Sequence, residues 1–386
     1  MATADHRPAN TFFSRSPLAS QPRANAEFKA ETAPMKQFRH NVIRAGLEAL
    51  YLTRVHHLLR PVFAGVGAIF MLHQVRPSRD DGFQPNHHLE ITPDFLRATL
   101  SYLRSQNIDI ITLDEMHRRL TERDFARRFA CLTLDDGYRD NRDFALPLLR
   151  EFDAPAAVFV ASDFADGFGR MWWVALERVV AKAERIETEI DGVAVRLDAG
   201  TPAAKQAAYD RLHDWLRGLP TEADLQREIS ALCRRYGADE TSICRELCLS
   251  WEELKPFAAD PLISIGAHTI THCNLARAPE KDAHQEMATG RARIEDVLQR
   301  PAVHFAYPYG DRIAAGPREF ALAQASGFKT AVTTRPGMVF PENVGHLTAL
   351  PRVSLNGNYQ DVRFLPVLTS GAATAMYNGF RRVNAG

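Results

Sequence analysis

The chain has 386 residues, of which 45% are hydrophobic and 24% are charged, a composition typical of a globular protein with a sizeable core. Lysine plus arginine and aspartate plus glutamate both number 47, so no net charge draws the whole chain to nucleic acid. The 5 cysteines form no CxxC pair, which predicts reduced thiols and a reducing compartment instead of a disulfide framework.

The N-terminal region divides into a tail and a helix. Residues 1–34 are rich in Ala, Pro, Ser and Asn without periodicity, which predicts a disordered tail without a secretory signal. The longest early apolar run, 62–72, is too short to cross a bilayer, so we expect no transmembrane segment and a cytoplasmic protein. Residues 35–61 have a helical pattern with basic residues such as Arg39 and Arg44. Such a helix lies either on a membrane or against its own domain.

Apolar strands and helices alternate through residues 62–360. Strands are expected at 66–72, 108–113, 129–134, 156–160, 262–265, 303–307, 330–333 and 350–355. Helices are expected near 92–105, 114–121, 138–152, 280–298 and 317–326. Continuously apolar strands separated by helices predict an α/β fold with a parallel sheet, in which active residues follow the C-terminal ends of the strands. Residues 361–386 are expected to form a C-terminal extension.

An insertion at 164–255 interrupts this alternation of strands and helices. It is expected to hold a helix after Trp172-Trp173, a hairpin of 186–190 and 193–197 turned by Asp191-Gly192, and helices near 203–217 and 222–236. The insertion either walls one side of a cleft or serves as scaffold.

Two short segments carry possible metal chemistry. Asp135-Asp136-Gly137 ends an apolar strand, and His268 and His272 follow more than a hundred residues later. Each segment alone is ordinary, since Asp-Asp-Gly is a common turn and two histidines at this spacing are often incidental. Together, two imidazoles and one carboxylate hold a divalent ion with open positions, while the second carboxylate can deprotonate a water molecule. Adjacent carboxylates also repel each other unless one binds a cation.

The chain resembles the polysaccharide deacetylase proteins (carbohydrate esterase family 4, NodB homology). The segments that carry the likeness are Leu132–Tyr138, His268–His272 and Phe305–Gly310, in the family's order. The likeness covers about residues 63–357 and implies a distorted (β/α)7 barrel. It also implies removal of N-acetyl groups from N-acetylhexosamine units in an oligo- or polysaccharide.

The resemblance assigns roles to particular residues. Asp136, His268 and His272 would bind a divalent metal, with Zn²⁺ the expected ion. Asp135 would be the general base, and the backbone N–H of Tyr309 would help to hold the oxyanion. Pro308 fixes its own φ and so helps to aim the loop that carries Tyr309, and both residues are expected to contact substrate.

Two departures from the family pattern leave alternatives open. Many members have Arg where Ala306 stands; Arg352 either replaces it beside Asp135 or is a structural arginine. The late Leu-x-x-His motif, source of the general acid, is missing. His73, which resembles the Tyr-His-x-Val element of exopolysaccharide-type deacetylases, is the favoured replacement, His346 is the alternative, and a third possibility is neither.

Aromatic residues near these motifs suggest sugar binding. Trp172 and Trp173 are expected either to offer a platform to the apolar face of a sugar or to anchor the insertion. Tyr138, directly after the acidic pair, is expected to line the pocket. Alternatives to N-deacetylation are hydrolysis of an O-acetyl ester or of another amide by the same fold, and a non-catalytic carbohydrate-binding barrel. The oligomeric state is left open.

Overall fold

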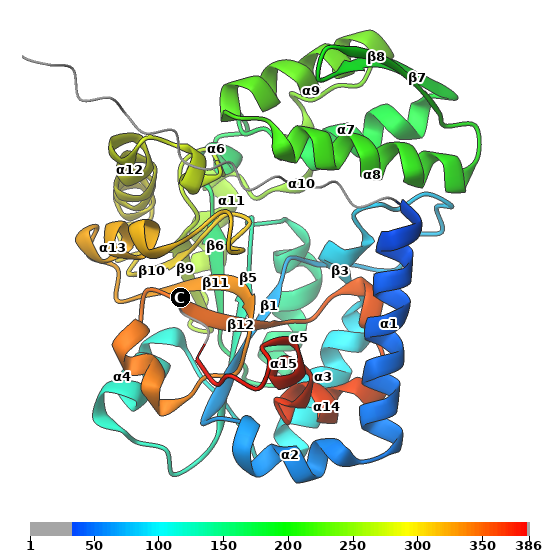
Figure 1. Cartoon of the computed structure of the whole chain (residues 1–386). Helices are drawn as coiled ribbons and strands as arrows, with labels where there is room; N and C mark the ends of the chain where they lie inside the picture. The colour runs from blue at the N-terminus through cyan, green and yellow to red at the C-terminus, as the bar shows by residue number, and fades with distance from the viewer. Residues whose placement is uncertain (1–32, 384–386) are drawn as a thin grey trace, which may run out of the picture.

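The computed structural model describes residues 33–383, and its centre is a closed barrel of seven parallel strands (Figure 1). Around the barrel the order is β1, β12, β11, β10, β9, β6 and β5, and β5 pairs again with β1. The strands are β1 Gly67–Leu72, β5 Phe129–Leu134, β6 Ala156–Val160, β9 Ile263–Ala267, β10 His304–Ala306, β11 Thr330–Pro336 and β12 Leu350–Ser354. The predicted (β/α)7 barrel is confirmed.

Alternation along the strands produces the two apolar layers of the barrel. In β5, Phe129 and Cys131 belong to one buried cluster, whereas Ala130, Leu132 and Leu134 belong to another. Because side chains point to opposite faces of a strand in turn, the first cluster fills the interior and the second packs under the outer helices. These outer helices are α3 Pro93–Ser105, α5 Leu146–Glu151, α11 Trp251–Ala258, α12 Glu280–Leu298 and α13 Pro317–Ala325. Helix α4 Leu113–Glu122 instead adds its buried residues to the first cluster.

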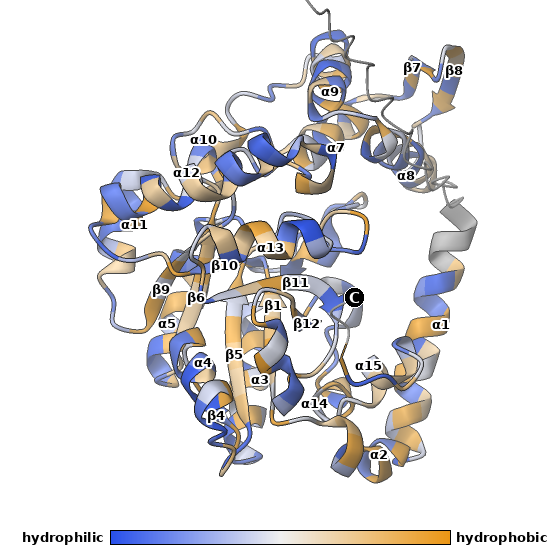
Figure 2. Ribbon diagram, turned by 60° about the vertical axis from the view of Figure 1, so that its left-hand side comes forward, coloured by the Kyte–Doolittle hydropathy of each residue, from blue (hydrophilic) through white to orange (hydrophobic). Residues whose placement is uncertain are grey.

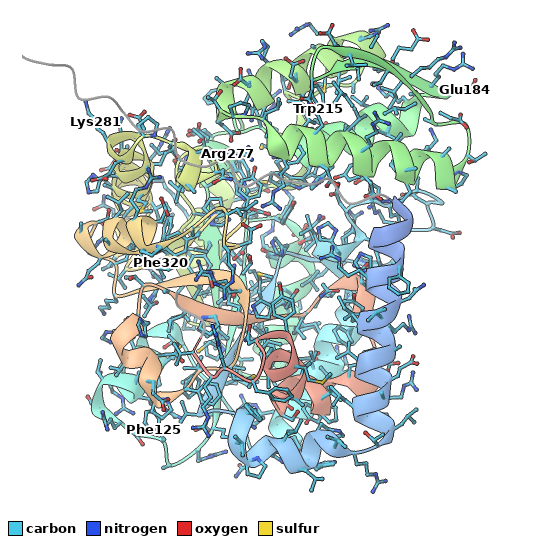
Figure 3. The ribbon with its side chains drawn as sticks, viewed as in Figure 1. Phe125, Glu184, Trp215, Arg277, Lys281 and Phe320 are labelled. Atoms are coloured by element: carbon cyan, nitrogen blue, oxygen red, sulfur yellow. The ribbon has the colours of Figure 1, made fainter. Side chains whose placement is uncertain are left out.

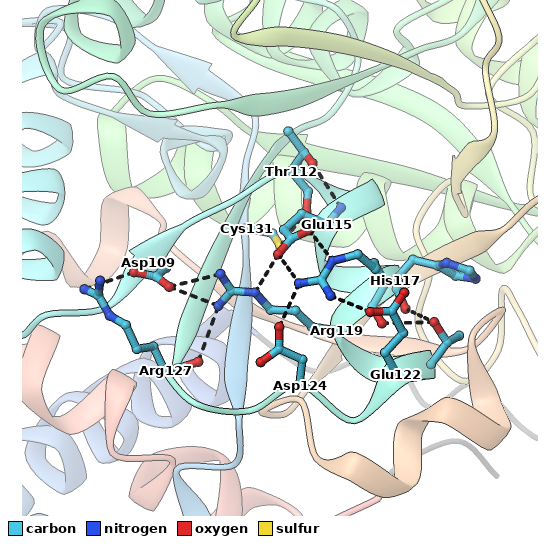
Figure 4. A network of polar contacts seen from close by, with 11 residues as sticks. Asp109, Thr112, Glu115, His117, Arg119, Glu122, Asp124, Arg127 and Cys131 are labelled. Carbon is cyan, nitrogen blue, oxygen red and sulfur yellow. Dashed lines mark hydrogen bonds and ion pairs between the residues drawn. The ribbon is translucent and has the colours of Figure 1, made fainter.

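Two predicted elements are shorter in the structure. The strand expected at 108–113 is reduced to β4 Asp109–Ile110, because the side chain of Thr112 accepts a hydrogen bond from the Glu115 N–H and starts α4. Arg119 then ties α4 to β4 through Asp109, at 3.0 Å (Figure 4). The helix expected at 138–152 begins only with a π-helical turn at Asn141–Ala145, which leads into α5.

The N-terminal helix is in fact two helices, α1 Ala33–Leu52 and α2 Val55–Phe63. Arg54 separates them with a left-handed φ of 57°. Leu47 and Leu50 pack on Phe364 and on the C-terminal helices, which are α14 Leu365–Thr369 and α15 Ala372–Tyr377. Helix α1 therefore packs on its own domain, which was one of the two alternatives expected for this region. Most of the expected tail, 1–32, lies outside the described residues.

The insertion forms a separate layer above the barrel (Figures 1 and 2). The hairpin is confirmed, with left-handed Asp191 and Gly192 at its turn. A second apolar cluster holds the insertion together. Its elements are α6 Ser162–Ala165, α7 Trp172–Lys182, β7 Arg185–Ile190, β8 Val193–Asp198, α8 Pro202–Gly218, α9 Glu222–Tyr236 and α10 Ile243–Leu247. A two-stranded pair, β2 Gln74–Val75 and β3 Glu90–Ile91, follows β1.

The cysteines agree with the sequence-based expectation. All of them are buried and free: Cys131, Cys233, Cys244, Cys248 and Cys273. No helix within residues 33–383 combines the length and the apolar character of a membrane span.

We predict that Leu212→Ala lowers the stability of the protein by about 2–5 kcal/mol, because Leu212 is fully buried in the apolar cluster of the insertion. Urea unfolding followed by tryptophan fluorescence measures this loss. The matched control Leu58→Ala removes a side chain that is 79% exposed and should change stability by less than about 0.5 kcal/mol. Equal losses in the two variants would contradict the assigned core.

Candidate active site

The acidic pair and the two histidines meet at the C-terminal ends of the barrel strands. Asp135 and Asp136 follow β5, and His268 and His272 follow β9. The Nε2 atoms of His268 and His272 lie 3.6 and 3.3 Å from Oδ1 of Asp136. Ligand atoms of these three residues all lie within 4.8 Å of one another. The structure thus brings together residues that are more than a hundred positions apart.

The backbone around these residues adopts an unusual conformation. Asp136, Thr269 and His272 have φ values of 72°, 68° and 62°, a left-handed region that non-glycine residues rarely occupy. The His272 N–H donates to the Thr269 hydroxyl at 2.9 Å, which stabilises the tight loop. Such conformations persist where the surroundings enforce them, and they concentrate at functional sites.

Helix α12 fixes the histidine loop from outside. A carboxylate oxygen of Glu286 accepts hydrogen bonds from the N–H groups of Ile270 and Thr271 at 2.9 and 3.0 Å. Gly290 permits the close approach, because a Cβ there would lie 2.8 Å from backbone atoms of Thr269. The sequence analysis overlooked Glu286 and Gly290, since neither stands within a recognisable motif.

The donor set suits a divalent cation. His268 Nδ1 lies 2.7 Å from the Ala306 carbonyl, so Nδ1 carries the hydrogen and Nε2 presents its lone pair to Asp136. Burial, followed by the charge of His272, lowers the pKa of His268 to about 4, which keeps the imidazole neutral. Oδ1 of Asp136 is buried and accepts no well-formed hydrogen bond from any residue in 33–383. Two imidazoles and one carboxylate fit Zn²⁺ well.

Arg352 holds Asp135 in a bidentate ion pair. Its two terminal nitrogens donate to the two carboxylate oxygens of Asp135 at 2.8 and 2.7 Å. Arg352 also donates to the Thr133 hydroxyl and to the Thr333 carbonyl, at 3.1 and 2.9 Å. Burial raises the pKa of Asp135, but the charge and hydrogen bonds of Arg352 outweigh it and hold the pKa below its ordinary range. Arg352 therefore lies beside Asp135, which was one of the two alternatives that the sequence left open for this residue.

His73 lies on the open side of Asp135. Its Nε2 is 3.8 Å from Oδ2 of Asp135, and its side chain is 18% exposed. Asn141, another residue that the sequence analysis overlooked, fixes the loop by donating to the His73 carbonyl at 2.8 Å. His346 is exposed and precedes β12, next to Leu347, whose carbonyl bonds to the start of β11. His346 therefore lies at the opposite end of the barrel.

The insertion contacts the Pro308-Tyr309 loop directly. Tyr309 has a left-handed φ of 60°, and its hydroxyl accepts a hydrogen bond from Trp172 Nε1 at 2.8 Å. The guanidinium of Arg217 stands 4.9 Å above the Tyr309 ring and also pairs with Asp311 at 2.6 Å. Arg277, at the junction of barrel and insertion, donates to the carbonyl of Arg217 (Figure 3).

The expected aromatic sugar platform is not what the structure has. Trp172, Trp173 and Tyr138 are 2%, 6% and 0% exposed, because they pack in the apolar cluster of the insertion. Both tryptophans therefore anchor the insertion, which was the other alternative, and the ring of Tyr138 has no exposed face either. His213 of α8, whose ring lies 5.0 Å from that of Trp172, was not expected here, because it stands in an ordinary amphipathic helix.

Comparison with known proteins agrees with this geometry. A hydrolytic centre at the C-terminal mouth of a (β/α)7 barrel is the class of site described above. The sequence profile named Polysaccharide deacetylase matches residues 122–328, and the chain belongs to this family. It is therefore a hydrolase that acts on carbon–nitrogen bonds of linear amides. No curated protein sequence matches the chain significantly.

Solved structures are similar in fold. The Streptococcus pyogenes deacetylase PplD in complex with acetate is 17% identical, with a TM-score of 0.50, covering 75% of this chain and 92% of that one. IcaB from Ammonifex degensii is 20% identical, with a TM-score of 0.47, covering 75% and 91% of the two chains.

We predict that Arg352→Met destabilises the protein by about 3–5 kcal/mol, because it leaves the buried Asp135 carboxylate without its partner. Combining it with Asp135→Asn should cost less than the sum of the two single losses, with a coupling of about 1–3 kcal/mol in urea unfolding. Strictly additive losses would show that the two side chains do not stabilise each other.

Proposed function

We propose that the protein is a metal-dependent deacetylase that removes N-acetyl groups from N-acetylhexosamine units of an oligo- or polysaccharide. One observation carries the proposal: Asp136, His268 and His272 converge at one point, and Asp135 lies beside them in an ion pair with Arg352. A metal-ligand set next to a second, independently held carboxylate is the minimum for hydrolysing an amide with an activated water.

Asp136, His268 and His272 would hold the cation, with Zn²⁺ the expected ion. When bound, the ion polarises the acetyl carbonyl and lowers the pKa of a coordinated water. The neutral His268, the carbonyl of Ala306 behind it and the Asp136 oxygen that faces both imidazoles all support this assignment.

Asp135 would accept the proton of the attacking water. Arg352 keeps the pKa of Asp135 low, so the group is an anion at neutral pH. Because both carboxylate oxygens are fixed by Arg352, the acceptor has one orientation. Arg352 is thus a positioning residue in this proposal.

His73 would donate a proton to the departing amine. Its position 3.8 Å from Asp135, on the more exposed side of the pair, supports a place next to a substrate that enters from solvent. The backbone N–H of Tyr309 would donate to the oxygen on which negative charge develops. The contacts of Trp172 and Arg217 with the Tyr309 ring support a rigid loop for that donor.

Asp135→Asn should keep the metal and lose nearly all turnover, because the amide cannot accept the proton. Asp136→Asn is the matched comparison and should lose both metal and turnover. Bound zinc is measured by elemental analysis, and acetate release is measured from N-acetylglucosamine oligomers and, in parallel, from an O-acetylated polysaccharide. Wild-type turnover by Asp135→Asn would remove this residue as the base. Release from the ester substrate alone would overturn the proposed amide specificity.

His73→Ala should reduce turnover by roughly 10²–10⁴-fold, the range expected for loss of a general acid, with the bound metal retained. His346→Ala is the matched control and should keep the wild-type rate, since His346 lies at the other end of the barrel. Steady-state acetate release across pH distinguishes the two variants. An unchanged rate in His73→Ala would exclude the assigned role.

A further inference from the structure

Helix α1 has a second apolar face that nothing in the barrel covers. One face packs on the domain through Leu47 and Leu50. The opposite face of α1 carries exposed apolar residues at helical spacing, and α2 has exposed apolar residues of its own. In α1 they are Phe38, Val42, Ala45, Ala49 and Leu52, and in α2 they are Val55, Leu58 and Val62. We call these eight residues the outer stripe. Leu52 and Leu58 are 73% and 79% exposed, far more than large aliphatic side chains usually are.

The outer stripe lies in a basic region. Residues 38–63 hold four arginines and one glutamate, although positive and negative charges balance at 47 each over the whole chain. The arginines are Arg39, Arg44, Arg54 and Arg60. An apolar face flanked by cationic side chains is the pattern of helices that lie in the interface of an anionic bilayer.

A cavity of about 390 Å³ opens at the corner between α1 and α2. It is lined by Leu52, Arg54, His56, His57 and Arg60 from the two helices, together with residues of α3 and α14. Among residues 33–383, no acidic side chain lines it, whereas Arg54 and Arg60 do. The pKa of His57 is lowered, first by the charge of His56 and further by the charges of Arg54 and Arg60.

Arg128 adds positive charge from behind the cavity. It donates to the Thr369 carbonyl at 2.8 Å, and Thr369 lines the cavity. Its Nε and Nη1 are buried and have no hydrogen-bond acceptor within residues 33–383. Burial first, and then the charge of Arg60, lowers the pKa of Arg128 to about 10. An anion in the cavity would relieve that repulsion.

We propose that the outer stripe docks on an anionic phospholipid surface and that the corner cavity receives a lipid phosphate. Leu52 belongs to both the stripe and the wall of the cavity, so one orientation serves both contacts. Figures 1 and 2 place α1 along one side of the molecule and α2 along the adjoining end, so that the two helices meet at an outer corner. This inference does not depend on the proposed deacetylation.

Flotation of the full chain with vesicles tests the proposal. The protein should bind vesicles of phosphatidylcholine with phosphatidylglycerol, and not vesicles of phosphatidylcholine alone, with binding weakened by salt. Leu52→Glu/Leu58→Glu and, separately, Arg54→Glu/Arg60→Glu should each weaken binding at least about tenfold. The matched controls Val193→Glu and Arg234→Glu change exposed residues of the insertion and should bind like the wild type.

Far-UV circular dichroism and the midpoint of thermal unfolding should be unchanged in both double variants, which shows that they fold. Absence of binding to the anionic vesicles, or equal binding by the double variants, would overturn the proposal. Thermal stabilisation by inorganic phosphate without vesicle binding would assign the cavity to a free anion instead. A dimer in sedimentation velocity that Leu52→Glu/Leu58→Glu dissociates, without vesicle binding, would assign the stripe to a second copy.

Discussion

Two adjacent carboxylates, each 2% exposed, lie at the end of β5, and the rest of the site is organised around their repulsion. Asp135 continues the inward alternation of β5 and meets the guanidinium of Arg352. Asp136 turns away through its left-handed φ of 72° and meets His268 and His272. The two carboxylates therefore have different partners, an arrangement that suits the proposed division between a metal ligand and a base.

Because the two carboxylates have different partners, the barrel must keep both partners in fixed positions. Arg352 comes from β12 and His268 from the end of β9, on opposite sides of β5 in the ring of strands. Only a closed barrel keeps both at hydrogen-bond distance from one acidic pair. The backbone of Ala306 also takes part in the site. Many family members have an arginine at this position, whereas Ala306 accepts a hydrogen bond from His268 through its carbonyl oxygen. The arginine beside Asp135 is Arg352, which comes from β12, two strands away.

The sequence was sufficient for most strands, because burial gives them a local pattern. The resemblance to the family singled out Asp136, His268 and His272, which the structure brings together. Burial on both sides makes β5 and β6 continuously apolar, and their predicted bounds agree with the structure. Contacts between distant residues were beyond such reasoning: Arg352 and Asp135 are 217 positions apart, and no local signal separated a structural arginine from a positioning one. Trp172 and Trp173 were left with two alternatives, platform or anchor, because sequence cannot tell an aromatic that lines a cleft from one that closes a core.

The burial of Trp172 points to a different use of the insertion. The indole is hidden, yet its N–H reaches the Tyr309 hydroxyl, so the insertion acts on the loop that carries the proposed oxyanion donor. Helix α8 of the insertion supplies Arg217 to the same ring and also contacts α1. Helix α8 therefore contacts both α1, which carries part of the outer stripe, and the loop that contains Tyr309. Because α1 packs on the domain and on α8 together, docking of its outer face would orient the mouth of the barrel without deforming the acidic pair inside it.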